Sequence, residues 1–218
     1  MDLWKMSAWK IFLAGGPIMW PILLCSVFGL AIILEKLLQL HSIKIDTGKF
    51  LSSLFDSLRR NKIKEAINHC DKTTAPIARI LKAGILKYDR SRDEIEEAME
   101  DASLYEIPRL EKKLNALATI AHISPLLGLL GTVTGMVRCF QTIQIKSASL
   151  NPVSPGDLAG GIWEALLTTV AGLIVAIPAY VAYNYLVSVI NNIVIDIERA
   201  STELVNFFAQ SSEQLKAK

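Results

Sequence analysis

The stretch PLLGLLGTVTGM, residues 125–136, combines an apolar pattern with three glycines and two threonines. It lies inside a run from Leu114 to Val137 that contains no Asp, Glu, Lys or Arg residue. A helix that crosses a bilayer needs roughly 20 apolar residues, so this run is long enough to span a membrane. Because glycine weakens an ordinary helix, its repeated use here indicates close helix packing or polar chemistry within the membrane.

Two more stretches are long and uncharged, from Ile11 to Leu34 and from Ala165 to Ile195. The chain of 218 residues is 51% hydrophobic and only 20% charged, which is unusual for a soluble domain. The first run exceeds the apolar core of a signal peptide, and no clear cleavage site follows it, so we expect a retained helix. The sequence therefore predicts an all-α, polytopic membrane protein with three transmembrane helices.

Hydropathy divides the chain into six successive parts, with long helices that extend from the membrane into the cytoplasm. We expect an N-terminal segment with transmembrane helix 1 at residues 1–40, a cytoplasmic helical region at 41–112, transmembrane helix 2 at 113–143, a short periplasmic loop at 144–157, transmembrane helix 3 at 158–190, and a cytoplasmic C-terminal helix at 191–218.

The orientation rests on the basic residues. Most of the 23 Lys and Arg residues lie between Lys36 and Lys113, whereas the connection between the second and third spans has only Arg138 and Lys146. Cytoplasmic loops carry an excess of basic residues, so the large loop is predicted to be cytoplasmic. The N-terminus is then periplasmic and the C-terminus cytoplasmic.

The large loop has helical signals. Ser91 followed by Glu94 is a capping box that starts a helix. An amphipathic stretch is expected from Thr47 to Cys70, and Pro108 is expected to kink or restart the helix that leads into the second span. The third helix is expected to run on past the membrane, because apolar residues recur along one side of it: Ile193, Ile197, Ala200, Leu204 and Phe207.

Small residues form a face on two of the spans. In the second span the face consists of Ala121, Pro125, Gly128, Thr132, Gly135 and Cys139, and in the third of Ala165, Thr169, Gly172, Ala176 and Ala179. Helices in lipid associate through close backbone approach across such residues. We assign helix packing to Gly128, Gly131, Gly135, Gly172, Pro125 and Pro178.

Polar groups inside the spans are the candidate functional residues. Thr132, Thr168 and Thr169 carry hydroxyls, and Glu164 precedes a long uncharged run. A carboxylate at the bilayer centre costs roughly 2.5–3.5 kcal/mol on insertion scales, so such a group usually faces a bundle interior or water. These four residues are interpreted as a proton path or pore lining. The alternative is that the threonines only bond to carbonyls of their own helices.

Other chemistries lack their motifs. The glycine-rich stretch has no Gly-Lys-Ser/Thr ending and is not a phosphate loop, and we find no protease or hydrolase signature. Cys25, Cys70 and Cys139 are too scattered for a disulfide framework or a metal site. We therefore expect no enzyme activity, no metal and no cofactor, and the near-neutral charge argues against a nucleic-acid partner.

Four stretches carry a family resemblance: GGPIMWPILLCSVFGLAIILEKL (15–37), APIARILKAGI (75–85), LATIAHISPLLGLLGTVTGMVRCF (117–140) and IWEALLTTVAGLIVAIPAYVAYN (162–184). With these residues the sequence resembles the ExbB/TolQ/MotA proton-channel family, and within it the ExbB/TolQ branch. His122 and Pro108 depart from that pattern, where a small residue and an uninterrupted helix would be expected.

The resemblance implies an inner-membrane ring of five copies, in which the second and third helices line a central space. Single-span partner subunits of the ExbD/TolR type would sit inside it. Proton flow would drive rotation, and the complex would transmit energy to the periplasm or outer membrane. Thr132 and Thr169 match the threonines that the family places beside the partner's carboxylate, and Glu164 matches its glutamate.

Two other functions stay open. The first is a purely structural membrane scaffold, in which the small residues serve packing alone. The second is the stator of a surface-motility machine. A small-solute transporter is the weakest alternative, because three spans offer no internal repeat.

Overall fold

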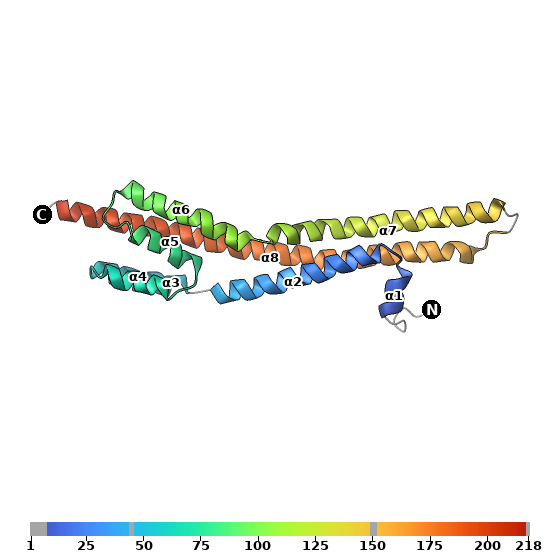
Figure 1. Cartoon of the computed structure of the whole chain (residues 1–218), viewed down its shortest axis with the longest axis horizontal. Coiled ribbons are helices and arrows are strands. Elements are labelled where there is room, and N and C mark those ends of the chain that lie inside the picture. Colours follow the sequence, from blue (N-terminus) through green and yellow to red (C-terminus); the bar gives the residue numbers. More distant parts are fainter. Residues whose placement is uncertain (1–7, 44–45, 149–151, 217–218) are drawn as a thin grey trace. The chain divides into compact units, whose positions relative to one another are not determined.

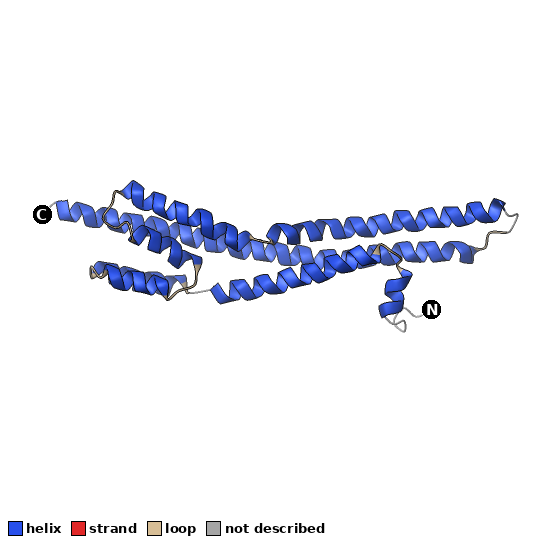
Figure 2. Cartoon of the chain, in the orientation of Figure 1, coloured by secondary structure: helices blue, strands red, loops and turns tan. Residues whose placement is uncertain are grey.

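The computed structural model describes residues 8–43, 46–148 and 152–216, and all regular elements within these ranges are α-helices (Figure 2). The helices, labelled in Figure 1, are α1 (Ala8–Ala14), α2 (Met19–Ile43), α3 (Thr47–Arg59), α4 (Ile63–Asp71), α5 (Pro76–Ile85), α6 (Arg92–Glu111), α7 (Leu114–Ala148) and α8 (Pro155–Lys216).

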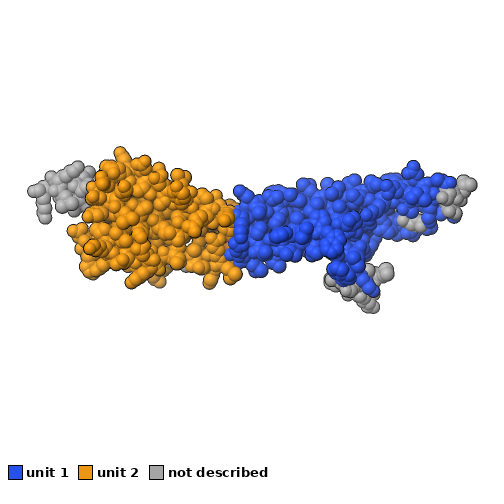
Figure 3. All heavy atoms as spheres, viewed as in Figure 1, with its two compact units in different colours: residues 1–35, 113–185 blue, residues 36–112, 186–218 orange. Residues whose placement is uncertain are grey.

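Three helical segments of the described chain are long and apolar enough to cross a membrane. They run from Met19 to Arg59, which includes α2 and α3, from Arg92 to Ala148, which includes α6 and α7, and from Leu158 to Gln210 within α8. The prediction of an all-helical chain with three membrane-spanning helices is therefore confirmed. The chain forms two compact units (Figure 3), and each is described by itself: unit 1 comprises Met1–Glu35 and Lys113–Tyr185, and unit 2 comprises Lys36–Lys112 and Leu186–Lys218.

Unit 1 contains the apolar parts of α2, α7 and α8. Its large apolar side chains point outward rather than into a core, as expected for helices whose solvent is lipid. Exposed examples are Val27, Phe28 and Leu30 of α2, Leu126, Leu129 and Val133 of α7, and Leu166, Val170 and Ile174 of α8. The buried positions are instead taken by small residues such as Ala121, Ser124 and Ala165.

Unit 2 has a hydrophobic core of the ordinary kind. Helices α3, α4, α5 and α6 pack with the C-terminal part of α8 around buried residues that include Leu54, Ile80, Leu81, Ile95 and Met99. From α8, Ile197, Ala200 and Leu204 are buried in this core, and Ile193 and Phe207 pack against it. The predicted apolar side of the extended third helix is therefore confirmed. Helix α8 also passes through Pro178 without a break.

The capping box is also confirmed. Ser91 is the N-cap of α6, and its hydroxyl accepts a hydrogen bond from the backbone N–H of Glu94 at 3.3 Å. The Ser91 hydroxyl in turn donates a hydrogen bond to the carboxylate of Glu94 at 3.1 Å. This pairing satisfies a backbone donor that the first helical turn would otherwise leave open.

The amphipathic stretch from Thr47 to Cys70 is two helices, not one. Helix α3 ends at Arg59 and α4 begins at Ile63, and Asn61 between them has a φ of 55°. Asparagine adopts this left-handed conformation more readily than most residues, so it supports a turn there. The apolar spacing continues across the turn, which is why periodicity alone does not reveal it.

The break before the second span lies after Pro108 and not at it. Helix α6 continues through Pro108 to Glu111, and the chain then turns at Lys112 and Lys113 before α7 begins at Leu114. Lys113 has a φ of 71°, which no right-handed helix allows. A proline within a helix removes one hydrogen bond, and here the packing of α6 in unit 2 tolerates that loss.

Candidate functional site

Four glycines bring α7 and α8 of unit 1 into close contact. We call Gly128, Gly131, Gly135 and Gly172 the glycine face. A Cβ on Gly128 would lie 3.1 Å from the backbone oxygen of Thr168, and one on Gly172 would lie 2.6 Å from the backbone oxygen of Ser124. Only glycine allows backbones to approach this closely.

Gly131 and Gly135 extend the glycine face along α7. A Cβ on Gly135 would lie 2.7 Å from the carbonyl oxygen of Gly161 and 2.8 Å from the Cβ of Ala165. A Cβ on Gly131 would overlap the side chain of Thr168. The two helices are therefore packed tightly enough to exclude even a methyl group at these positions.

The buried stripe of α7 differs slightly from the one read off the sequence. Ser124 and Gly131 are buried in it, whereas their neighbours Pro125 and Thr132 are only partly buried. Pro178 of α8 is exposed in the single chain. The face of α7 that contacts α8 is therefore shifted by about one residue from the predicted face, and Gly131 packs against Thr168. This fit depends on both helices and is not visible in the sequence of either one.

Two of the candidate hydroxyls donate hydrogen bonds to backbone carbonyls inside this contact. Thr168 is 1% exposed, and its hydroxyl donates to the carbonyl oxygen of Ala165 at 2.8 Å. The Thr169 hydroxyl lies 3.2 Å from the Gly128 carbonyl oxygen of α7 and 3.3 Å from that of Ala165. Thr168 thus packs against Gly131, and Thr169 links α8 to α7.

Thr132 lies one residue outside the contact and is more accessible. Its hydroxyl donates to the carbonyl oxygen of Leu129 at 2.6 Å. A hydroxyl oxygen that donates its proton still has lone pairs and can accept a hydrogen bond. Thr132 is one helical turn from Gly128, so its hydroxyl lies on the same side of α7 as the acceptor of Thr169.

Glu164 is paired with a residue that sequence reasoning treated only as a loop charge. Its carboxylate forms an ion pair with Arg138 of α7. The side chain of Glu164 is 16% exposed and that of Arg138 is 47% exposed. The sequence does contain a signal for this pair. Arg138 directly follows one uncharged run, Glu164 directly precedes the next, and a short connection joins the two helices.

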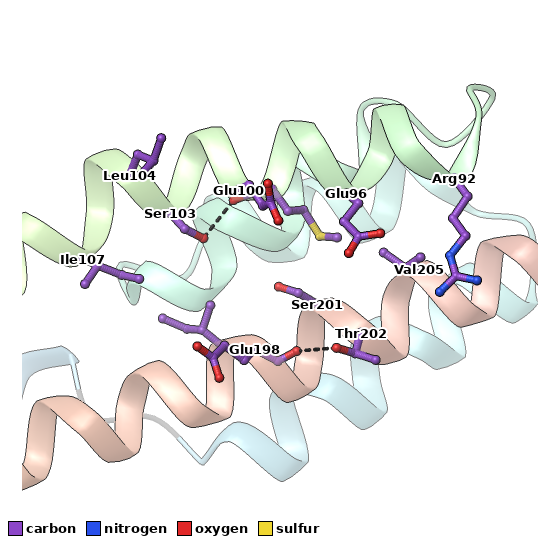
Figure 4. Close-up of a pocket in the computed structure, with 12 residues that line it drawn as sticks. Arg92, Glu96, Glu100, Ser103, Leu104, Ile107, Glu198, Ser201, Thr202 and Val205 are labelled. Carbon is purple, nitrogen blue, oxygen red and sulfur yellow. Dashed lines mark hydrogen bonds between the residues drawn. The ribbon is translucent and has the colours of Figure 1, made fainter.

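A groove of a different kind lies in unit 2 between α6 and α8 (Figure 4). It has a volume of about 430 Å³, an apolar part with Met99 and Val205, and acidic groups at Glu96, Glu100 and Glu198. No polar residue of the candidate site lines it. Among the described residues, no group of three His, Cys, Asp or Glu side chains is placed to hold a metal ion.

A thiol of unit 2 is electrostatically unusual. Cys70 is buried in the core of that unit, and burial raises its pKa to about 11 from an ordinary value of 9.0. Its neighbour Asp71 contributes in the same direction. A thiol of this kind is unreactive at neutral pH and has a packing role.

A comparison with family models decides the class of this chain. Residues 72–199, more than half of the sequence, match the model described as the MotA/TolQ/ExbB proton channel family. The chain belongs to this family. The match includes α7 with its glycines and the part of α8 with Glu164, Thr168 and Thr169. The resemblance predicted from the sequence is confirmed, and the family is one of proton channels and not of enzymes.

Two relatives of this chain are named as biopolymer transport proteins. The chain is 30% identical to a protein of Methanothermobacter thermautotrophicus named as a homolog of the biopolymer transport protein ExbB, over 87% of this chain and 66% of that protein. It is 29% identical to the biopolymer transport protein exbB1 of Vibrio cholerae, over 75% of this chain and 72% of that protein.

A third relative has a different name. Over 41% of this chain and 37% of the relative, the identity to the Tol-Pal system protein TolQ of Haemophilus influenzae is 46%.

Family membership and three apolar helices together make this chain a multi-pass membrane protein.

Proposed function

We propose that this chain is the ring-forming subunit of an inner-membrane motor that the proton-motive force drives, and that it transmits energy to the periplasm or outer membrane. One observation carries the proposal: in a chain of a proton channel family, Thr132, Thr169 and Glu164 place polar groups on α7 and α8 where the surrounding surface is apolar. Polar groups at such positions usually mark an ion path.

The chemistry of the path follows from the hydroxyls. Thr132 can accept a hydrogen bond from a neutral carboxyl group, or from a water molecule beside it, because its oxygen retains lone pairs. The hydroxyl of Thr169 lies beside the carbonyl oxygen of Gly128, which is one helical turn of α7 away from Thr132. Each unit charge that falls through 100 mV releases about 2.3 kcal/mol, so a few protons per step supply useful work.

The proposed assembly is a homopentamer around a single-span partner of the ExbD/TolR type. Two features of the chain support it. The outer faces of α2, α7 and α8 are apolar and exposed, so they are available to lipid and to neighbouring copies. The candidate path also lacks a carboxyl group next to Thr132 in the described chain, so we assign the proton-carrying carboxyl group to the partner.

The proposed topology follows the basic residues. Residues 41–112 and 191–218 lie in the cytoplasm, residues 144–157 lie in the periplasm, and the N-terminus is periplasmic. The compactness of unit 2, which contains residues from both proposed cytoplasmic parts, supports this division because its core joins α3–α6 to the end of α8.

The test uses Thr132→Val, Thr169→Val and Glu164→Ala in cells that contain the partner. Valine keeps the shape of threonine but removes the hydroxyl. We expect normal expression and ring formation with loss of gradient-dependent activity. Thr119→Val is the matched control, because Thr119 is an exposed residue of α7 and its hydroxyl donates to the carbonyl oxygen of Asn115 in the same helix. Full activity of all three variants would contradict the proposal.

A structural scaffold is the second candidate. The observation that favours it is Thr168, which is buried, bonds within its own helix and fills the space above Gly131. A scaffold tolerates loss of the hydroxyls of Thr132 and Thr169 and of the charge of Glu164, provided that the ring assembles. The variants above therefore separate the two functions.

A further inference from the structure

The Arg138–Glu164 pair joins the two helices of the candidate path. Arg138 lies in the last third of α7 and Glu164 in the first part of α8, so the pair bridges the ends that the short connection joins. Each residue is the lone Asp, Glu, Lys or Arg of a long apolar stretch. In such surroundings a charged group is stable only when it is paired.

The turn between α1 and α2 covers this pair. Gly16 has a φ of 73°, a conformation that residues with a side chain rarely adopt. A Cβ at this position would overlap the carboxylate of Glu164 and would lie 3.3 Å from a guanidinium nitrogen of Arg138. The backbone of Gly16 therefore lies directly against the pair.

Hydrogen bonds hold this turn in place. The N–H of Gly16 donates to the carbonyl oxygen of Leu13 at 3.3 Å, and the carbonyl of Gly16 accepts from the N–H of Met19 at 3.2 Å. Three segments that are far apart in the sequence, at Gly16, Arg138 and Glu164, thus meet at one point of unit 1.

We propose that Arg138 is the positioning counter-ion of Glu164, and that the pair under the Gly16 turn is a fixed clamp. The clamp holds the α1–α2 turn, α7 and α8 together. Glu164 acts there as the ion-pair partner of Arg138 and not as the carrier of the transported proton. The statement about the proton rests on the proposed function, whereas the clamp itself does not.

An ion pair has a recognisable response to substitution. Neutralising one partner leaves the other charge unpaired, which is more harmful than removing both charges. The variants Arg138→Gln and Glu164→Gln should each lower the melting temperature while the protein still folds and assembles, and the double variant should be closer to the wild type than either. A residue that carries protons on its own would show no such rescue.

The first measurement is carbodiimide labelling of the purified protein. Dicyclohexylcarbodiimide reacts with a protonated carboxyl group in an apolar setting and not with an ion-paired carboxylate. Mass spectrometry of the peptide that contains Glu164 should show little labelling in the wild type and in Arg138→Lys, and strong labelling in Arg138→Gln. Labelling that is strong in the wild type, or unaffected by Arg138→Gln, overturns the proposal.

The second measurement is thermal unfolding of the same purified variants in detergent. Each single variant should melt at least ~4 °C below the wild type, and the double variant should recover about half of that difference. Gly16→Ala should also lower the melting temperature, because a Cβ overlaps the pair. Gly160→Ala is the control, since its Cβ meets nothing within 4 Å. Additive losses in the double variant overturn the clamp.

Both measurements use protein without a partner and without a proton gradient. If the pair behaves as described but Thr132→Val, Thr169→Val and Glu164→Ala retain full activity in cells, the proposed function fails and the clamp stands. If those variants lose activity but the labelling does not respond to Arg138, the clamp fails and the proposed function stands.

Discussion

The Nζ atom of Lys36 donates a hydrogen bond to the carbonyl oxygen of Leu110 at 2.8 Å, within unit 2. Lys36 is only 2% exposed, and its ammonium group also donates to the side-chain oxygen of Gln39 at 2.9 Å. Leu110 lies in the last turn of α6, where carbonyl oxygens lack partners within the helix. A cation at this end also interacts favourably with the helix dipole.

Lys36→Met should therefore destabilise unit 2. The substitution keeps much of the side-chain volume but leaves the Leu110 carbonyl buried without its donor, which costs about 1–3 kcal/mol. In a chain of this size that corresponds to a fall in melting temperature of roughly 2–4 °C for each kcal/mol. Thermal unfolding in detergent measures it, with Lys87→Met at an exposed site as the control. Equal melting of both variants would show that the buried bond contributes nothing.

The glycine face gives a prediction on assembly. Gly131→Leu and Gly172→Leu should separate α7 from α8, because even a Cβ at these positions overlaps Thr168 or approaches the Ser124 carbonyl to 2.6 Å. We expect loss of the proposed ring on size-exclusion chromatography and a melting temperature lowered by several degrees. Gly160→Leu, at an open position, should leave both unchanged. An unchanged oligomer mass for the first two variants would exclude a role of these glycines in assembly.

The orientation is tested by reporter fusions. A reporter inserted after Lys87 should be cytoplasmic, because the loop that contains it has most of the basic residues. A reporter near Ser149, which lies outside the described residues, should be external. Alkaline phosphatase and a fluorescent protein that folds only in the cytoplasm give opposite readouts at each position. Reversed labelling at both positions would invert the proposed topology.

Cys70 gives a prediction on thiol reactivity. Its pKa of about 11 lies two units above the ordinary value of 9.0, so at pH 8 the thiolate population should be about 100-fold lower than in the unfolded chain. A variant with Cys25→Ala and Cys139→Ala isolates this thiol. Its alkylation should be slow in the folded protein and at least about 100-fold faster in denaturant.

The same shift predicts a pH dependence of stability. Between pH 9 and 11 the unfolded thiol loses its proton while the folded one keeps it, so the unfolded state binds fewer protons and stability falls as pH rises. Below pH 9 both states hold the proton, and Cys70 contributes no pH dependence. Cys70→Ala should remove the part of the alkaline destabilisation that belongs to this residue. An unchanged alkaline profile in that variant would contradict the assignment.

The sequence by itself determined the features that depend on the order of residues along the chain. Three uncharged runs predict three spanning helices, because each backbone group in lipid needs a partner within its own helix. The Ser91–Glu94 capping box predicts the start of α6, since a cap joins residues only three positions apart. The side of α8 with Ile197 and Leu204 follows from helical periodicity.

Only the tertiary structure decided the features that depend on how distant segments meet. The break at Asn61 lies within an unbroken apolar pattern, and the break at Lys113 lies after the proline that predicts it. The burial of Ser124 and Gly131 in place of Pro125 and Thr132 depends on the rotation of α7 against Thr168.

The polar contacts between distant segments show the same division. Arg138 and Lys36 look like ordinary charges of a loop or a helix end, and their distant contacts with Glu164 and the Leu110 carbonyl are not fixed by the residues beside them in the sequence. Arg138 meets Glu164, and Lys36 meets the Leu110 carbonyl, because packing brings these groups together. Helix propensity and apolar periodicity are properties of the local sequence. A contact between two helices forms only when the helices adopt one register, and the packing along the whole of their contact sets that register.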